Sequence, residues 1–168
     1  MPTFLTRDNI TEITGQKNLE QITEIEILFL TIDELGSLDL CHNLKKLTLL
    51  DNALQRISNL SPVSMTLTNL TLSDQNIRVM ENLDLPQLRE LYLHRNSITK
   101  IESLSGCPRL RKLWIFQNKI SSIVSLHTVP ELQECWLQSN QISSLQGIEY
   151  CLQVRLSLSS QVYLQLCM

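Results

Sequence analysis

The chain has 168 residues, of which 43% are hydrophobic and 18% are charged, and its formal net charge is −3 at pH 7. This length is enough for one domain, and the weak negative charge excludes a general attraction to nucleic acid or to anionic membranes. No stretch reaches the roughly 20 apolar residues of a membrane-spanning helix, and residues 1–15 hold no apolar block of the signal-peptide kind. We therefore expect neither a membrane nor a nucleic-acid partner.

Residues 1–21 are polar and only weakly periodic. A chain of stacked repeats needs polar terminal units that shield its apolar interior from water. We expect this segment to cover the first repeat as an N-terminal cap and to be partly helical.

From residue 22 onward, one pattern of apolar residues recurs about every 22 residues. Copies of the pattern begin at Ile22, Leu44, Leu67, Leu88, Leu110 and Leu132. In the clearest pair, Leu88, Leu91, Leu93, Asn96, Ile98, Ile101 and Leu104 match Leu110, Leu113, Ile115, Asn118, Ile120, Ile123 and Leu126. Self-similarity at a fixed period of this size predicts a solenoid.

Each copy combines two spacings. Around Leu91 and Leu93, apolar residues alternate with polar ones, which is typical of a short strand with one buried face. After Ile98 the spacing becomes three, which suits a 3₁₀-like segment because residues i and i+3 eclipse in that geometry. We predict an α/β solenoid with a parallel concave sheet of short strands and with 3₁₀ or irregular segments on the convex side.

The repeats share an amide between the strand and the returning segment. The predicted amide column comprises Asn52, Gln75, Asn96, Asn118 and Asn140. A buried amide without partners costs roughly 1–3 kcal/mol, so these side chains should bond the backbone of their own and adjacent turns. We expect Asn118→Leu to destabilise more than Asn52→Leu, because Asn118 has asparagine neighbours on both sides.

The seventh copy is degraded. Its remaining core and amide positions are Leu156, Leu158 and Gln161, and residues 162–166 alternate apolar side chains where a polar cap is expected. We predict a solenoid over residues 22–165 with about seven repeats, followed by a tail at 166–168. The apolar end favours a fragment, an alternative C-terminus, or an end that another chain covers.

One column of side chains should point away from the core along the concave sheet. It comprises Glu26, Thr48, Thr71, Tyr92, Trp114, Trp136 and Ser157. Tyr92, Trp114 and Trp136 become neighbours there, with Phe116 beside them. These aromatics either shield the sheet or form a binding hot spot, in which Trp and Tyr are enriched. We predict a protein-binding site of Glu90, Tyr92, His94, Trp114, Phe116, Glu134 and Trp136.

The pattern LxxLxLxxNxIxxIxxL resembles the short leucine-rich-repeat family with 22-residue units, over about residues 22–165. This family forms a right-handed superhelix and includes a protein phosphatase 1 regulatory subunit and leucine-rich repeat-containing protein 9. The segment ELQECWLQSN is similar to a late repeat of that subunit. The match implies a phosphatase-contact role for Glu134 and Trp136 and places Tyr92 in the same column, whereas Trp114 and Ser157 depart from the subunit's residues.

The resemblance leaves three functions open: a phosphatase-regulatory adapter, a scaffold segment of a ciliary or cytoskeletal protein, and a ribonucleoprotein adapter similar to the spliceosomal A-prime protein. All are non-catalytic, and the sequence offers no glycine-rich phosphate loop. His42, His94 and His127 occupy different repeat phases. We expect no small-molecule substrate, although His94 beside Glu90 is a conceivable acid–base pair.

The five cysteines include no CxxC pair, which argues against a zinc site. Cys41 and Cys107 each lie three residues before a strand-entry leucine, and Cys135 takes a core position of a strand. This is typical of small buried residues and favours a reducing compartment. We expect a cytoplasmic location, with nuclear and ciliary locations as alternatives, and neither a metal nor a cofactor.

Overall fold

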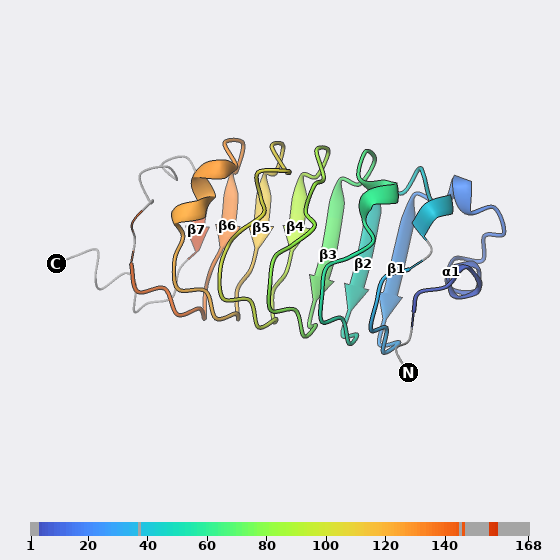
Figure 1. The fold of residues 1–168 in the computed structure, drawn as a ribbon, viewed down its shortest axis with the longest axis horizontal. Helices are drawn as coiled ribbons and strands as arrows, with labels where there is room; N and C mark the ends of the chain where they lie inside the picture. Colours follow the sequence, from blue (N-terminus) through green and yellow to red (C-terminus); the bar gives the residue numbers. More distant parts are fainter. Residues whose placement is uncertain (1–3, 37, 145, 147–154, 158–168) are drawn as a thin grey trace.

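The computed structural model describes residues 4–36, 38–144, 146 and 155–157. The strands are β1 (Glu24–Leu28), β2 (Lys46–Leu50), β3 (Asn69–Ser73), β4 (Glu90–Tyr92), β5 (Lys112–Trp114), β6 (Glu134–Trp136) and β7 (Arg155–Ser157). They form one sheet in chain order (Figure 1), and every neighbouring pair is parallel. The prediction of a solenoid with a parallel sheet is confirmed.

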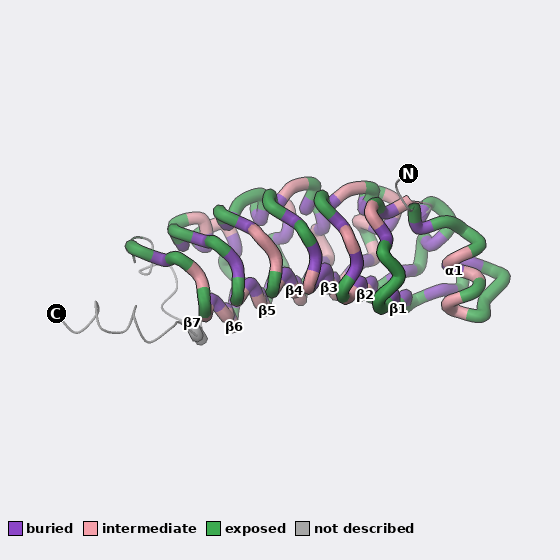
Figure 2. The backbone as a smooth tube through the Cα atoms, turned by 90° about the horizontal axis from the view of Figure 1, so that it is seen from below, coloured by how far each residue is buried: buried purple, intermediate pink, exposed green. Residues whose placement is uncertain are grey.

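The register of the sheet keeps equivalent repeat positions beside each other. Leu47 pairs with Ile25 on one side and with Leu70 on the other, and all of them are buried. Alternation explains this arrangement, because successive side chains of a strand point to opposite faces. The buried leucines and isoleucines of all turns join into one continuous core, and buried positions recur in each turn of the coil (Figure 2).

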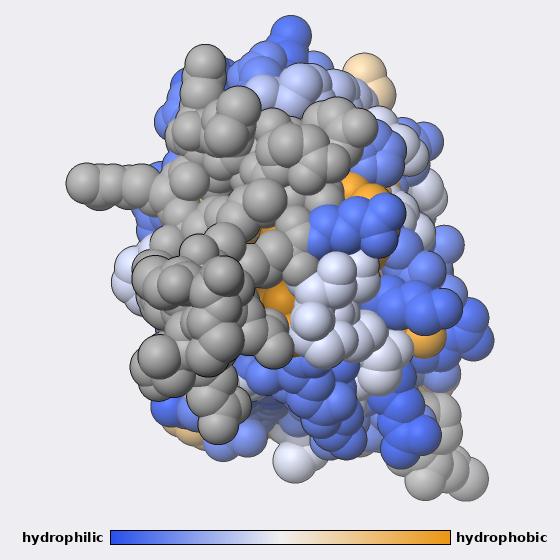
Figure 3. Space-filling model, turned by 90° about the vertical axis from the view of Figure 1, so that its left-hand side faces the viewer, coloured by the Kyte–Doolittle hydropathy of each residue, from blue (hydrophilic) through white to orange (hydrophobic). Residues whose placement is uncertain are grey.

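The segments that return from one strand to the next are short. Three of them in the described part of the chain contain 3₁₀ turns: η2 (Leu38–Leu40), η3 (Ser61–Val63) and η4 (Val124–Thr128). A further 3₁₀ turn, η1 (Leu19–Gln21), precedes β1. Pro62 lies in the first turn of η3, where its missing N–H costs nothing. The returns from β3 to β4 and from β4 to β5 contain no regular element. Hydrophilic side chains cover much of the coloured surface at the β7 end (Figure 3).

An α-helix, α1 (Arg7–Thr14), lies beyond β1 in the segment expected to cap the first turn. Thr6 and Asn9 form a capping box, in which each side chain accepts from the other residue's backbone N–H. The helix ends at Gly15, whose φ of 67° is the left-handed conformation that glycine adopts without strain. Leu5 and Ile10 are fully buried, so this segment covers the end of the core with apolar side chains.

The amides of the column bond to the main chain of their own turn and of the preceding one. Asn118 donates from Nδ2 to the carbonyls of Leu93 (2.9 Å) and Ile115 (3.1 Å), and its Oδ1 accepts from the N–H of Ile98 (2.9 Å). Asn52, Gln75, Asn96 and Asn140 repeat this arrangement. Each amide thereby connects two consecutive turns.

The first turn departs from the amide column at one position, and part of the last turn lies outside the described residues. Leu30 stands at the amide position of the first turn and is exposed, and its N–H donates to Asn52. Ile148, Leu158, Gln161 and the tail at 166–168 lie outside the described residues, as does the predicted apolar C-terminal end.

We expect Asn118→Leu and Asn52→Leu to lose similar stability. The partners of both amides are backbone groups, so an asparagine in the next turn does not add to the stability that either amide provides. The reason for ranking the loss in Asn118→Leu above the loss in Asn52→Leu is therefore removed. Each substitution leaves buried backbone groups unpaired, which costs about 1–3 kcal/mol for each group. Urea denaturation measures the loss, and Asn76→Leu, at an exposed neighbouring position, should change stability by less than about 0.5 kcal/mol. A difference of several kcal/mol between the two core variants would contradict this account.

Candidate functional site

The sheet register brings Tyr92, Trp114 and Trp136 into one row on the face of the sheet opposite the buried leucines. The indoles of Trp114 and Trp136 stack with ring centroids 4.2 Å apart and an interplanar angle of 9°. The ring of Tyr92 meets Trp114 edge-on at 4.8 Å and 67°. Strands about 4.8 Å apart place equivalent side chains at stacking distance, so the repeat itself produces this row.

A second aromatic pair lies two residues further along the strands. Phe116 and His94 stack at 4.5 Å with an interplanar angle of 7°, and Phe116 lies 6.2 Å from Trp136 at a tilt of 45°. We call the surface formed by Tyr92, Trp114, Phe116 and Trp136 the concave aromatic face. It brings together four of the eight aromatic side chains of the protein, which are two Trp, three Tyr and three Phe.

Two carboxylates hold the aromatic rings from one side. Glu90 accepts hydrogen bonds from the Tyr92 hydroxyl (2.7 Å) and from Asn69 Nδ2 (2.6 Å), and it pairs with Lys112 Nζ at 3.1 Å. Glu134 accepts from the indole Nε1 of Trp114 at 2.8 Å. These bonds fix the orientation of the rings, and each ionised carboxylate keeps further acceptor capacity.

The same contacts set the charge of the site. Burial raises the pKa of the Tyr92 hydroxyl well above its ordinary value, and the bond to Glu90 adds to this. Burial on its own would raise the pKa of Glu90, but the hydrogen bonds from Tyr92 and Lys112 outweigh it and lower that pKa. At neutral pH the tyrosine is therefore neutral and Glu90 is ionised.

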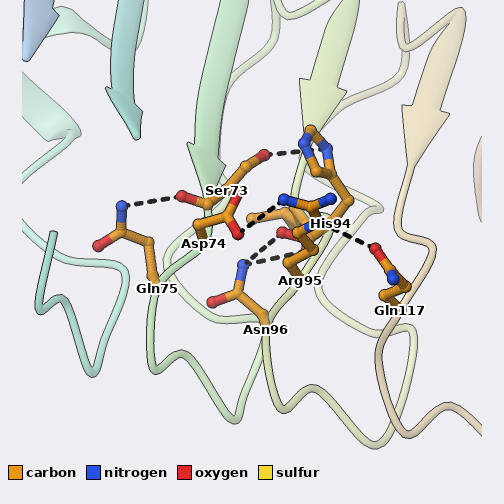
Figure 4. Close-up of polar contacts among 8 residues, drawn as sticks. Ser73, Asp74, Gln75, His94, Arg95, Asn96 and Gln117 are labelled. Carbon is orange, nitrogen blue, oxygen red and sulfur yellow. Dashed lines mark hydrogen bonds and ion pairs between the residues drawn. The ribbon is translucent and has the colours of Figure 1, made fainter. Parts of the chain in front are cut away.

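His94 is held between neighbouring turns (Figure 4). Its Nδ1 lies 3.0 Å from Ser73 Oγ, and its ring stacks on Phe116. Burial lowers the pKa of this imidazole, and the nearby Asp74 carboxylate raises it only in part. Glu90 and His94 have separate partners, so nothing in the geometry joins them into an acid–base pair.

A polar ladder that the repeat pattern did not predict follows the ends of the strands. Arg95 Nη1 lies 3.4 Å from Asp74 Oδ1, and Arg95 Nε donates to Gln117 Oε1 at 3.0 Å (Figure 4). The three residues each precede a column amide and have positive φ values of 54° to 56°. Their shared place before the amide is the signal that could have revealed the ladder. Exposed pairs of this kind add little stability.

The aromatic face is only partly accessible to solvent. Tyr92, Trp114, Phe116 and Trp136 are all half-buried, because they cover one another. Among the described residues, the large apolar side chains that are exposed lie elsewhere, and the repeat pattern did not predict their exposure: Phe4, Leu28, Phe29, Leu30, Leu40, Met65, Val79 and Val124.

Cys41, Cys107 and Cys135 are buried. Burial raises the pKa of the Cys107 thiol to about 11, so the reactive thiolate is scarce at neutral pH. Within the described ranges, no three His, Cys, Asp or Glu side chains gather in a way that could hold a metal ion. That part of the chain also contains no helix with the length and apolar character needed to cross a bilayer.

Comparison with known proteins agrees with this geometry. Residues 65–120 match the family model of the leucine-rich repeat. The fold is a leucine-rich-repeat solenoid. A leucine-rich-repeat protein of Leptospira interrogans superposes with a TM-score of 0.74 at 18% identity, covering 82% of this chain and 37% of that one. No curated protein sequence matches.

Two proteins of Listeria monocytogenes share the solenoid. The functional domain of InlJ, which includes a cysteine ladder, superposes with a TM-score of 0.71 at 16% identity over 94% of this chain and 32% of that one. An internalin, InlF, gives 0.66 at 20% identity over 91% and 54%. This chain thus spans between about a third and a little over half of the length of these structures. At such identities the likeness concerns the fold.

The half-buried imidazole of His94 leads to a prediction about how stability depends on pH. Because the pKa of His94 is lower in the folded chain than the ordinary value of about 6.5, the unfolded chain binds more protons below that value. Stability should therefore fall as the pH drops from about 6.5 toward the lowered pKa, and this part should vanish in His94→Gln. Urea denaturation from pH 8 to pH 5 measures it, with His42→Gln, at an exposed position, as the control. An NMR titration of His94 at or above about 6.5 would contradict the assignment.

Proposed function

We propose that this protein is a non-catalytic interaction module that binds a protein partner through its concave aromatic face. The observation that carries the proposal is the stacked indole pair of Trp114 and Trp136, held on the side of the sheet that faces away from the core. The rim of the site is formed by Glu90, His94 and Glu134.

Folding of the solenoid does not require aromatic residues in this column. At the same register, β1, β2 and β3 carry Glu26, Thr48 and Thr71, and these strands form the same ladder without aromatic side chains. The aromatics of β4, β5 and β6 therefore add something that the sheet does not need. Tyrosine and tryptophan dominate the energetic centres of protein interfaces, and they supply large contact area with few rotatable bonds.

The surroundings of the rings fit the anatomy of an interface, which has an apolar centre and a polar rim. The carboxylates of Glu90 and Glu134 are already oriented by hydrogen bonds from the rings. Because the rings and carboxylates are fixed before binding, association costs less conformational entropy in ordering these side chains. Lys112 adds positive charge beside Glu90, and Arg95 adds positive charge beside Asp74, so the rim can complement a partner of mixed charge.

Leucine-rich-repeat domains are in general protein–protein interaction modules, which supports the assignment of an interaction module rather than an enzyme. The proposal involves no small-molecule substrate, cofactor or nucleic acid. The cytoplasmic, nuclear or ciliary location, the ciliary scaffold and the ribonucleoprotein adapter stay predictions from the sequence.

The test compares wild type with a Tyr92→Ala, Trp114→Ala, Trp136→Ala variant in affinity capture from cell extract, followed by titration of each captured protein. Loss of a single hot-spot side chain costs at least about 2 kcal/mol, or roughly thirtyfold in Kd. We therefore expect the triple variant to lose the partners that wild type captures.

The matched control is Met65→Ala, Val79→Ala, Val124→Ala, which removes three exposed apolar side chains from the returning segments. This variant should keep the partners. Circular dichroism must show that both variants are folded. Equal capture by the aromatic variant and wild type would overturn the proposal.

The phosphatase 1 catalytic subunit is the first specific partner to test. The support is the resemblance of ELQECWLQSN to a phosphatase-regulatory repeat, together with the location of Glu134 and Trp136 on one strand of the aromatic face. The purified subunit should bind wild type. Its affinity for the Glu134→Ala, Trp136→Ala variant should be at least about thirtyfold lower than for wild type. Equal binding by both would remove this assignment while leaving the broader proposal to the capture experiment.

A further inference from the structure

The outer edge of β1 offers a row of backbone groups to a further strand. In five consecutive turns, the first residue of a strand donates its N–H to a carbonyl of the preceding turn. These bonds run from Lys46 to Thr23, Asn69 to Lys45, Glu90 to Thr68, Lys112 to Arg89 and Glu134 to Arg111, at 3.0 to 3.1 Å. Glu24, the first residue of β1, makes no such bond to any other residue that the structure describes.

The direction of the remaining backbone groups follows from the ladder between β1 and β2. Lys46 N donates to Thr23 O, and Phe29 N donates to Leu50 O, both at 3.1 Å. In a parallel ladder, alternate residues bond to opposite neighbours, so the odd-numbered residues from Thr23 to Phe29 face β2. The N–H and C=O groups of Glu24, Glu26 and Leu28 consequently face away from the sheet, and all three residues are exposed.

A cavity adjoins the amino-terminal half of this edge. Its volume is about 420 Å³. Its lining includes Ile13 and Thr14 at the end of α1, Gln16 just after the helix, Thr23 just before β1, and Glu24 and Glu26 of β1. This volume lies in the range of about 300–1,000 Å³ that is usual for ligand pockets. The helix covers the end of the core but leaves room beside the strand.

The negative charge of this edge favours a basic occupant. Residues 1–40 contain eight acidic and two basic side chains, and two of the acidic ones, Glu24 and Glu26, lie on the edge strand itself. The last turn of α1 holds no basic residue, so the negative end of the helix dipole at the cavity is not neutralised there. On the other side of Glu24, Lys46 of β2 forms an ion pair with it at 2.8 Å, which shows how a lysine on an adjacent strand reaches this carboxylate.

We propose that the β1 edge, with the adjoining cavity, binds an extended basic segment of a partner protein by strand addition. The incoming strand pairs with the backbone of Glu24, Glu26 and Leu28, and alternate lysine or arginine side chains lie beside the two carboxylates. Main-chain hydrogen bonds supply affinity in this mode of recognition, and side-chain contacts supply specificity. The site is separate from the concave aromatic face and does not depend on it.

The probe is a fluorescein-labelled hexapeptide of alternating lysine and valine, titrated against the full chain by fluorescence anisotropy. The same hexapeptide with every backbone amide N-methylated keeps its charge and loses its donors, and it should not bind. NMR hydrogen exchange should show slower exchange at the amides of Glu24, Glu26 and Leu28 when the unmodified peptide is bound. Equal binding of the two peptides, or unchanged exchange at these amides, would overturn the proposal.

Variants separate backbone pairing from charge. Glu26→Lys should weaken the peptide roughly tenfold, whereas Glu102→Lys, the same change at an exposed site on a returning segment, should leave it within about twofold. Glu26→Pro removes an N–H that faces away from β2, a position where edge strands tolerate proline, and it should abolish binding while the chain stays folded. An equal loss of peptide affinity in Glu102→Lys would mean that the peptide responds only to long-range charge, and it would refute the site.

The aromatic triple variant distinguishes this site from the proposed function. Tyr92→Ala, Trp114→Ala, Trp136→Ala should bind the lysine–valine peptide as wild type does, because these side chains lie on β4, β5 and β6. Loss of peptide binding in this variant, with the fold intact, would move the peptide to the concave aromatic face and overturn the assignment to β1.

Discussion

The structure depends on a register that every turn shares. Seven parallel strands pair so that equivalent repeat positions are neighbours, and each buried amide bonds the main chain of two consecutive turns. A slip of one residue between two strands would move their leucines from the core to the concave face, and it would also break these amide bonds. Packing and hydrogen bonding therefore specify the same alignment.

This register converts sequence spacing into a surface. Side chains that lie about 22 residues apart become neighbours across the sheet, which is how two indoles from different repeats stack at 4.2 Å. The neighbouring carboxylates arise in the same way, since Glu134 of β6 reaches the indole of Trp114 on β5. A solenoid can thus change one site by substitutions in a single column without changing its core, because the two faces of each strand are independent.

The register also creates an asymmetry between the two directions along the sheet. Each concave-facing residue bonds backward to the preceding turn, so the first strand is left with backbone groups that face outward. Ile10 of helix α1 and Leu5, which precedes the helix, cover the apolar core at this end. A helix cannot extend the hydrogen-bond ladder of a sheet, because its own backbone groups are already paired within it. Glu24 and Glu26 make the edge unattractive to apolar and acidic strands, which limits self-association.

The sequence by itself determined the solenoid, the strand positions, the amide column and the residues that share the concave column, because these depend only on a repeat that is visible as spacing. It placed Tyr92, Trp114 and Trp136 in one row, but it could not show that they cover one another and remain half-buried. Only the tertiary structure decided that Glu134 bonds Trp114, that Arg95 connects Asp74 with Gln117, and that Leu28, Phe29 and Leu30 are exposed. Those outcomes depend on which rotamers fit between adjacent turns and on which turn lacks a neighbour, and neither is encoded in the period of a single chain.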